Sequence, residues 1–171
     1  LDLADGDVLN LLGKPVQIRW GSASKNTPFH CDTDVVQELW VKTPRIRLDD
    51  DAQTASLKRE NAVAAVLGVY LLSYLNRRAQ IYALEFGLRY CDIALSNAKT
   101  LWGTCRQDRQ IRMNWRLVFL DVALVDYVLA HELAHTIHMN HSPAFWQVVA
   151  QLCPDYRNLR RQLKSIDLRA A

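Results

Sequence analysis

The chain has 171 residues, of which 50% are hydrophobic and 23% are charged, so its composition is that of one globular domain and excludes a disordered chain. The net charge of +3 is too small to indicate nucleic-acid binding. Residues 1–51 carry 6 basic and 9 acidic side chains (net −3), and residues 52–171 carry 15 and 9 (net +6), so an anionic partner should meet the second part.

Short strands joined by polar turns are predicted for the first 51 residues. Apolar and polar residues alternate over residues 16–20, and Gly21-Ser22 follows as a turn signal. Residues 35–41 are a second candidate strand, which ends at Thr43-Pro44. The acidic run over residues 49–51 precedes a helical pattern. Because acidic residues suit a helix N-terminus, we interpret this run as a cap and not as a metal site.

A long helix is predicted over residues 52–86, with Gly87 as its C-terminal stop. Its apolar run over residues 62–75 contains Gly68 and Ser73. This run is too short and too interrupted to span a bilayer, so we expect it to be buried in the core.

A strand is predicted over residues 110–117, where apolar and polar residues alternate and place Arg112 and Arg116 on one face. Helices are then expected from about residue 121 to 138, from Ser142-Pro143 with serine as the N-cap, and from near Pro154. Because strands precede helices, the pattern favours an α+β fold over an alternating α/β fold.

The cysteines and the N-terminus bear on the cellular compartment. The four cysteines lie far apart and form no CxxC pair: Cys31, Cys91, Cys105 and Cys153. This spacing favours reduced thiols over a disulfide framework, and it argues against a cysteine-based zinc site. No secretory signal pattern opens the sequence. We therefore expect a cytoplasmic protein without a membrane partner.

Histidines are concentrated in one short segment. Four of the five lie within eleven residues: His131, His135, His138 and His141. His131 and His135 belong to an HExxH motif and share a helix face, so both imidazoles can reach one ion. Glu132 can approach a water on that ion as a general base. The alternative is a surface helix with incidental histidines, but the apolar flanking residues indicate a buried helix, whose polar side chains need partners or a metal.

The third ligand is expected to be His141. A catalytic zinc site has three protein ligands and one open position. His138 lies about 10.5 Å from His131 along a continuous helix, so three successive turns would converge poorly on one ion. His141 follows a predicted turn at Met139-Asn140 and can approach from another direction. The spacing equals that of the metzincin motif, but no methionine follows His141, so a metzincin is not expected.

Several segments together resemble the YgjP-like metallopeptidase domain, a relative of the SprT and Wss-like zincins. These segments are WGTC at 102–105, IRMNWRL at 111–117, DYVLAHELAH at 126–135, NHSPAFW at 140–146 and PDYR at 154–157. The resemblance covers roughly residues 52–166, and residues 1–51 match loosely. It implies one zinc ion bound by His131, His135 and His141, with Glu132 as the base. The family usually has arginine where this chain has Leu101, a departure that affects any substrate contact made there.

The resemblance completes the expected architecture. We expect a β-rich segment over residues 1–51 and a zincin-like metallohydrolase domain over residues 52–171, together forming one compact unit. The second part should contain a long core helix, a small antiparallel sheet, the HExxH helix and C-terminal helices.

Two groups of basic residues leave alternatives open. Arg106, Arg109, Arg112 and Arg116 form either a solvated strand face or an anion-binding wall of the cleft. The last helix carries Arg157, Arg160, Arg161 and Lys164 on one face, which is more typical of a solvated surface than of a nucleic-acid contact.

Three functions follow from these features. The first is a zinc hydrolase of peptide bonds, in which the strand near Ile111 could pair with an extended substrate. The second keeps the metal and acts as a nucleoside triphosphate pyrophosphatase, with arginines on the phosphates. The third is a zinc-stabilised nucleic-acid-binding module, against which Glu132 argues because a structural site needs no base.

Overall fold

The computed structural model describes residues 3–21 and 38–168. Its first sheet has the order β1-β2-β3, with β1 (Val8–Leu11) antiparallel and β3 (Glu38–Lys42) parallel to β2 (Lys14–Gly21). The strand predicted over residues 16–20 is confirmed within β2. Of the second predicted strand, residues 38–41 lie in β3 and residues 35–37 lie outside the described residues. Alternation buries one face of this sheet, which presents Val16, Ile18, Leu39 and Val41 to the core.

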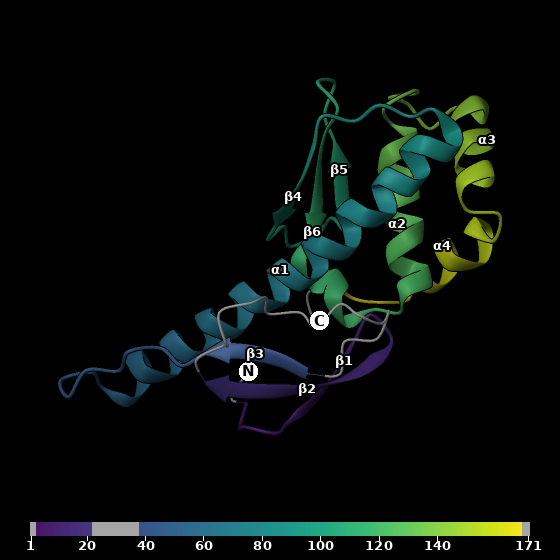
Figure 1. The fold of residues 1–171 in the computed structure, drawn as a ribbon. Coiled ribbons are helices and arrows are strands. Elements are labelled where there is room, and N and C mark those ends of the chain that lie inside the picture. Colours follow the sequence, from purple (N-terminus) through teal and green to yellow (C-terminus); the bar gives the residue numbers. More distant parts are fainter. Residues whose placement is uncertain (1–2, 22–37, 169–171) are drawn as a thin grey trace.

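Helix α1 (Ala52–Phe86) connects the two sheets and has the predicted bounds. Asp51 accepts a hydrogen bond from the backbone N–H of Thr54 at 2.7 Å, which confirms the acidic run as an N-cap. Gly87 ends the helix in the left-handed conformation, with φ of 66°. The apolar run contributes a buried stripe at helical spacing: Val63, Leu67, Leu71 and Leu75. Figure 1 shows this long helix crossing the molecule from the first sheet to the C-terminal helices.

The second sheet has the order β4-β6-β5 and packs near α1 and α2 (Figure 1). Its central strand, β6 (Gln110–Asn114), runs parallel to β4 (Asp92–Ser96) and antiparallel to β5 (Gly103–Cys105). The prediction of a small antiparallel sheet is therefore wrong, because the β4–β6 pair is parallel. The architecture is nevertheless α+β, with two small mixed sheets and four α-helices in the described part of the chain.

The strand predicted over residues 110–117 ends three residues early. After Asn114 the chain turns into the 3-10 helix η1 (Trp115–Phe119). The Asn114 side chain caps this helix by accepting from Arg116 N–H at 3.1 Å, and it donates to the carbonyls of Ala98 and Leu101 at 2.8 and 3.0 Å. Because η1 breaks the alternation of the strand, Leu117 and Val118 are both buried.

The C-terminal half consists of α2 (Val122–Ala134), α3 (Pro143–Leu152) and α4 (Tyr156–Lys164). Ser142 caps α3 by accepting from Phe145 N–H at 3.3 Å, as predicted. The predicted end of α2 at residue 138 is wrong, since regular helix stops at Ala134. There the Thr136 hydroxyl donates to the Leu133 carbonyl at 2.6 Å, and the chain continues as a tight turn.

A partly buried polar cluster ties α1 to α2. Asp126 on α2 accepts hydrogen bonds from the Tyr74 hydroxyl at 2.5 Å and from Arg78 Nε at 2.9 Å. Burial raises the pKa of Asp126, and burial together with the bond to Asp126 raises that of Tyr74. The contact fixes the first half of the helix that carries the HExxH motif. Every helix in the described ranges is too short or too polar to cross a membrane.

Candidate metal centre and active site

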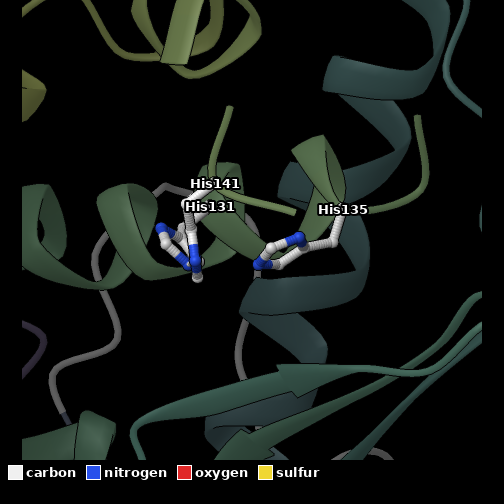
Figure 2. A group of neighbouring side chains, drawn as sticks. All are labelled: His131, His135 and His141. Carbon is white, nitrogen blue, oxygen red and sulfur yellow. Dashed lines mark hydrogen bonds between the residues drawn. The ribbon is translucent and has the colours of Figure 1, made fainter. Parts of the chain in front are cut away.

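Three of the four clustered histidines converge on one point. His131 lies in the last turn of α2, His135 caps the end of that helix, and His141 returns from the loop before α3. One ring nitrogen of each lies within 4.8 Å of the others, and the Nε2 atoms of His131 and His141 are 3.1 Å apart. Figure 2 shows the imidazoles of His131 and His141 side by side, with that of His135 directed toward them.

His138 has a different place. Its side chain is not part of the cluster formed by His131, His135 and His141. Its backbone carbonyl lies 3.0 Å from Nδ1 of His135. Because a carbonyl only accepts, Nδ1 of His135 must carry the proton, which leaves Nε2 with a free lone pair. Such a hydrogen bond orients a metal-binding imidazole and fixes its tautomer.

Two of the histidines, His131 and His135, are held in the neutral form that binds metals. Burial, followed by the nearby charges of His135, His141 and Arg160, lowers the pKa of His131 to about 3. Burial also lowers the pKa of His135. Nδ1 of His131 is buried without a hydrogen-bond partner in the described part of the chain. On that side the His131 ring is held by aromatic packing, with the rings of Tyr127, Phe145 and Trp146 at 6.2, 4.9 and 5.8 Å.

This arrangement fits one tetrahedral metal ion. Zinc–nitrogen distances of ~2.0–2.1 Å place two ligand nitrogens about 3.3 Å apart, close to the 3.1 Å between the two Nε2 atoms. Three neutral imidazoles are a donor set that suits zinc and other borderline metals. A fourth position would remain open, because the described residues supply three ligands to this cluster.

Two aromatic residues of α3 support the histidine cluster. The fully buried Phe145 ring lies 4.5 Å from that of His135 and 4.9 Å from those of His131 and His141. The Trp146 ring stacks on His141 at 5.9 Å. Sequence analysis did not identify these supports. The only available sign was their position directly after the Ser142 cap, which fixes the start of α3 beside the cluster.

Glu132 follows His131 directly in α2, and its side chain is buried, with 5% exposed. Burial raises the pKa of its carboxyl to about 8. Strand β5 packs closely against it: a Cβ atom on Gly103 would lie 2.7 Å from Glu132 Oε1. A side chain at position 103 would therefore collide with the carboxyl group. Sequence analysis also missed this role of Gly103, which depends on a contact between distant segments.

The arginines predicted to share a strand face do not do so. Arg112 is exposed on β6, whereas Arg116 belongs to η1, donates to Asn97 Oδ1 at 2.7 Å and lies over the Trp115 ring. The predicted common orientation is wrong because the strand ends at Asn114. Leu101, at the position where the family usually has arginine, is exposed.

Burial raises the pKa of the Cys105 and Cys153 thiols, which opposes their activation as nucleophiles. Burial, and then the charge of Glu132, raise the pKa of Cys105 to about 11. Cys91, Cys105 and Cys153 are free thiols, and Cys31 lies outside the described residues.

Comparison with known proteins gives one match. Searches of curated proteins and of solved structures found no significant match. A family model, described as YgjP-like, metallopeptidase domain, matches residues 2–166. The match includes the N-terminal sheet, whereas the resemblance seen in the sequence motifs covers roughly residues 52–166. Since it covers nearly the whole chain, the protein belongs to the YgjP-like metallopeptidase domain family.

Proposed function

We propose that the protein is a zinc-dependent peptidase in which His131, His135 and His141 hold the metal and Glu132 is the general base. The observation that carries this proposal is the convergence of three imidazole nitrogens within 4.8 Å beside one buried carboxyl group. Membership of a metallopeptidase domain family supports the choice of peptide bonds. Zinc is favoured because all three side chains are imidazoles and leave one position open.

The histidines, Glu132 and Gly103 have different roles in the proposed hydrolysis. A zinc ion held by the three histidines would supply a Lewis acid and would lower the pKa of a water toward ~7. Glu132 would accept a proton from the attacking water and transfer it to the leaving amine. To accept a proton Glu132 must be ionised, and a metal ion bound at the histidine cluster would favour that state by offsetting the rise in pKa that burial causes. Gly103 keeps the space that the carboxyl group occupies.

The substrate-pairing strand differs from the one expected from the sequence. The strand that contains Ile111 is β6, and both of its sides are paired, with β4 and with β5. β6 therefore has no unpaired edge with which a substrate could form hydrogen bonds. Strand β5 is at the edge of the sheet and contacts α2 beside Glu132. The Trp102 carbonyl accepts from Asn114 N–H, and Arg106 N–H donates to the Gln110 carbonyl, so the backbone groups of these two β5 neighbours point toward β6. Because backbone groups alternate sides along a strand, those of Gly103 and Cys105 point away from β6, toward the open edge of the sheet. We propose that an extended substrate pairs there.

The alternative substrate is a nucleoside triphosphate hydrolysed at the same centre. That hypothesis depended on Arg112 and Arg116. These two arginines do not share a strand face, and they do not line the hollow between α3 and α4 or the adjacent hollow at Trp102 and Tyr127. The third hypothesis, a zinc-stabilised nucleic-acid-binding module, does not account for a buried glutamate next to the ligands. Peptide hydrolysis is therefore the function that the site supports best.

A substrate screen tests the proposal. Zinc-loaded protein is incubated with fluorescein-labelled casein and, separately, with a panel of nucleoside triphosphates, and the Glu132→Gln protein serves as the control in both. We expect casein fragments from the wild type, none from Glu132→Gln, and no pyrophosphate. Release of pyrophosphate with intact casein would establish the alternative instead.

A further inference from the structure

A basic groove lies beside the histidine cluster, between α3 and α4. Its volume is about 1020 Å³, and its floor includes Trp146 and Tyr156. Among the described residues that line it, four are basic and none is acidic: Arg157, Arg160, Arg161 and Lys164. These four side chains are exposed and share one face of α4, whose other face buries Leu159.

The groove is connected to the proposed active site through Trp146. The Trp146 ring stacks on His141, with 5.9 Å between the ring centroids and an interplanar angle of 25°. The Arg160 guanidinium lies 4.5 Å from the centroid of the same ring, and Tyr156 stacks on it at 5.5 Å. Trp146 therefore links the histidine cluster to the residues that line the groove.

No salt bridge among the described residues pairs the positive charge of the groove. Arg160 and Lys164 also line an adjacent hollow of about 590 Å³ that reaches Tyr127 and Trp102 and includes one acidic residue, Asp167. Uncompensated positive charge in a hollow attracts anionic ligands. A surface that was only solvated would not need this concave shape or the aromatic floor.

We propose that this groove binds an acidic segment of the peptide substrate, so that the enzyme prefers cleavage sites flanked by aspartate or glutamate on one side. The inference rests on the proposed peptidase function. Guanidinium groups match carboxylates in bidentate fashion, and the aromatic floor of Trp146 and Tyr156 suits the apolar parts of the same side chains. Because these basic side chains are exposed, each contact is weak, and the preference arises from several contacts together.

Binding tests the proposal directly. Zinc-loaded Glu132→Gln protein is titrated into a fluorescein-labelled peptide rich in glutamate, and into the same peptide with glutamine in place of glutamate. The groove variant is Arg160→Gln/Lys164→Gln, and its charge-matched control is Arg59→Gln/Arg77→Gln, which changes exposed residues of α1. Tryptophan fluorescence is recorded in parallel, because a ligand over Trp146 should change it.

The expected results are specific to the groove. The glutamate peptide should bind more tightly than the glutamine peptide, and the groove variant should lose about five- to tenfold in affinity while the control keeps it. Added salt should reduce this difference. Equal binding of the two peptides, or equal loss in both variants, would overturn the proposal. Groove-dependent binding of single-stranded DNA or a nucleoside triphosphate in preference to the glutamate peptide would also overturn it.

Digestion of a peptide library separates this inference from the proposed function. Enrichment of acidic residues beside the cleaved bonds, lost in the groove variant, would support both. Cleavage without acidic preference would overturn the inference and leave the peptidase function intact. Absence of cleavage together with groove-dependent binding of the glutamate peptide would contradict the peptidase function, while the acidic-peptide site would stand.

Discussion

Gly103→Ala should damage catalysis through Glu132 without touching a ligand. The added Cβ would lie 2.7 Å from Oε1 and 2.8 Å from Cγ of Glu132, whereas non-bonded carbon atoms pack at ~3.5–4.0 Å. The overlap with Cγ is therefore about 0.7 Å, and the carboxyl group must move. Displacement of a reacting group by about 1 Å can cost ~100-fold in rate. We expect kcat to fall by about 10- to 100-fold, with bound zinc unchanged.

Casein hydrolysis, urea unfolding and zinc content of the Gly103→Ala protein check this prediction. Overpacking should also lower the free energy of unfolding by about 1–3 kcal/mol. Gly68→Ala is the control, because its Cβ would meet the Leu95 side chain at 3.2 Å where α1 packs against β4, and its kcat should equal that of the wild type. A Gly103→Ala protein with normal kcat would refute the argument that this glycine keeps the space for Glu132.

The remaining predictions concern the metal ligands and the support of α2. His141→Ala should lose zinc, measured by atomic emission, while His138→Ala should retain it because only the backbone of His138 contacts His135; the reverse order would show that the third ligand is wrong. Zinc should raise the melting temperature of the wild type and of Glu132→Gln, but not of His141→Ala. Arg78→Met should lower the free energy of unfolding in urea by about 2 kcal/mol, since it leaves the partly buried Asp126 without its cation. The exposed Arg77→Met is its control, and equal losses in both would contradict a stabilising role for the Arg78 contact.

Local signals were sufficient to predict α1 and the histidine cluster. Both ends of α1 are marked by residues that act within one turn, Asp51 as the N-cap and Gly87 in the left-handed conformation. The histidines could be predicted as neighbours because they lie within eleven residues on one helix and the turn that follows it. Their function as metal ligands stays a prediction.

Contacts between distant segments explain what the sequence did not reveal. The end of β6 depends on Asn114, whose side chain bonds to the carbonyls of Ala98 and Leu101, 16 and 13 residues away. Periodicity alone could not distinguish a longer strand from a 3-10 turn there. The contact of Gly103 with Glu132 likewise joins β5 to α2. β4 and β6 are parallel because the chain forms β5 between them in sequence and β5 runs antiparallel to β6. The three residues of β5 carry too weak a pattern for this strand to be predicted.

The most direct test of a zinc-dependent peptidase centred on three histidines is a zinc titration of the metal-free protein, with new casein termini counted by mass spectrometry. We expect cleavage to rise in proportion to zinc and to saturate at about one equivalent per chain, the number that three histidine ligands can hold. Glu132→Gln should bind the same equivalent and produce no termini, because it lacks the base. Cleavage by the metal-free protein, or by zinc-loaded Glu132→Gln at the rate of the wild type, would contradict it.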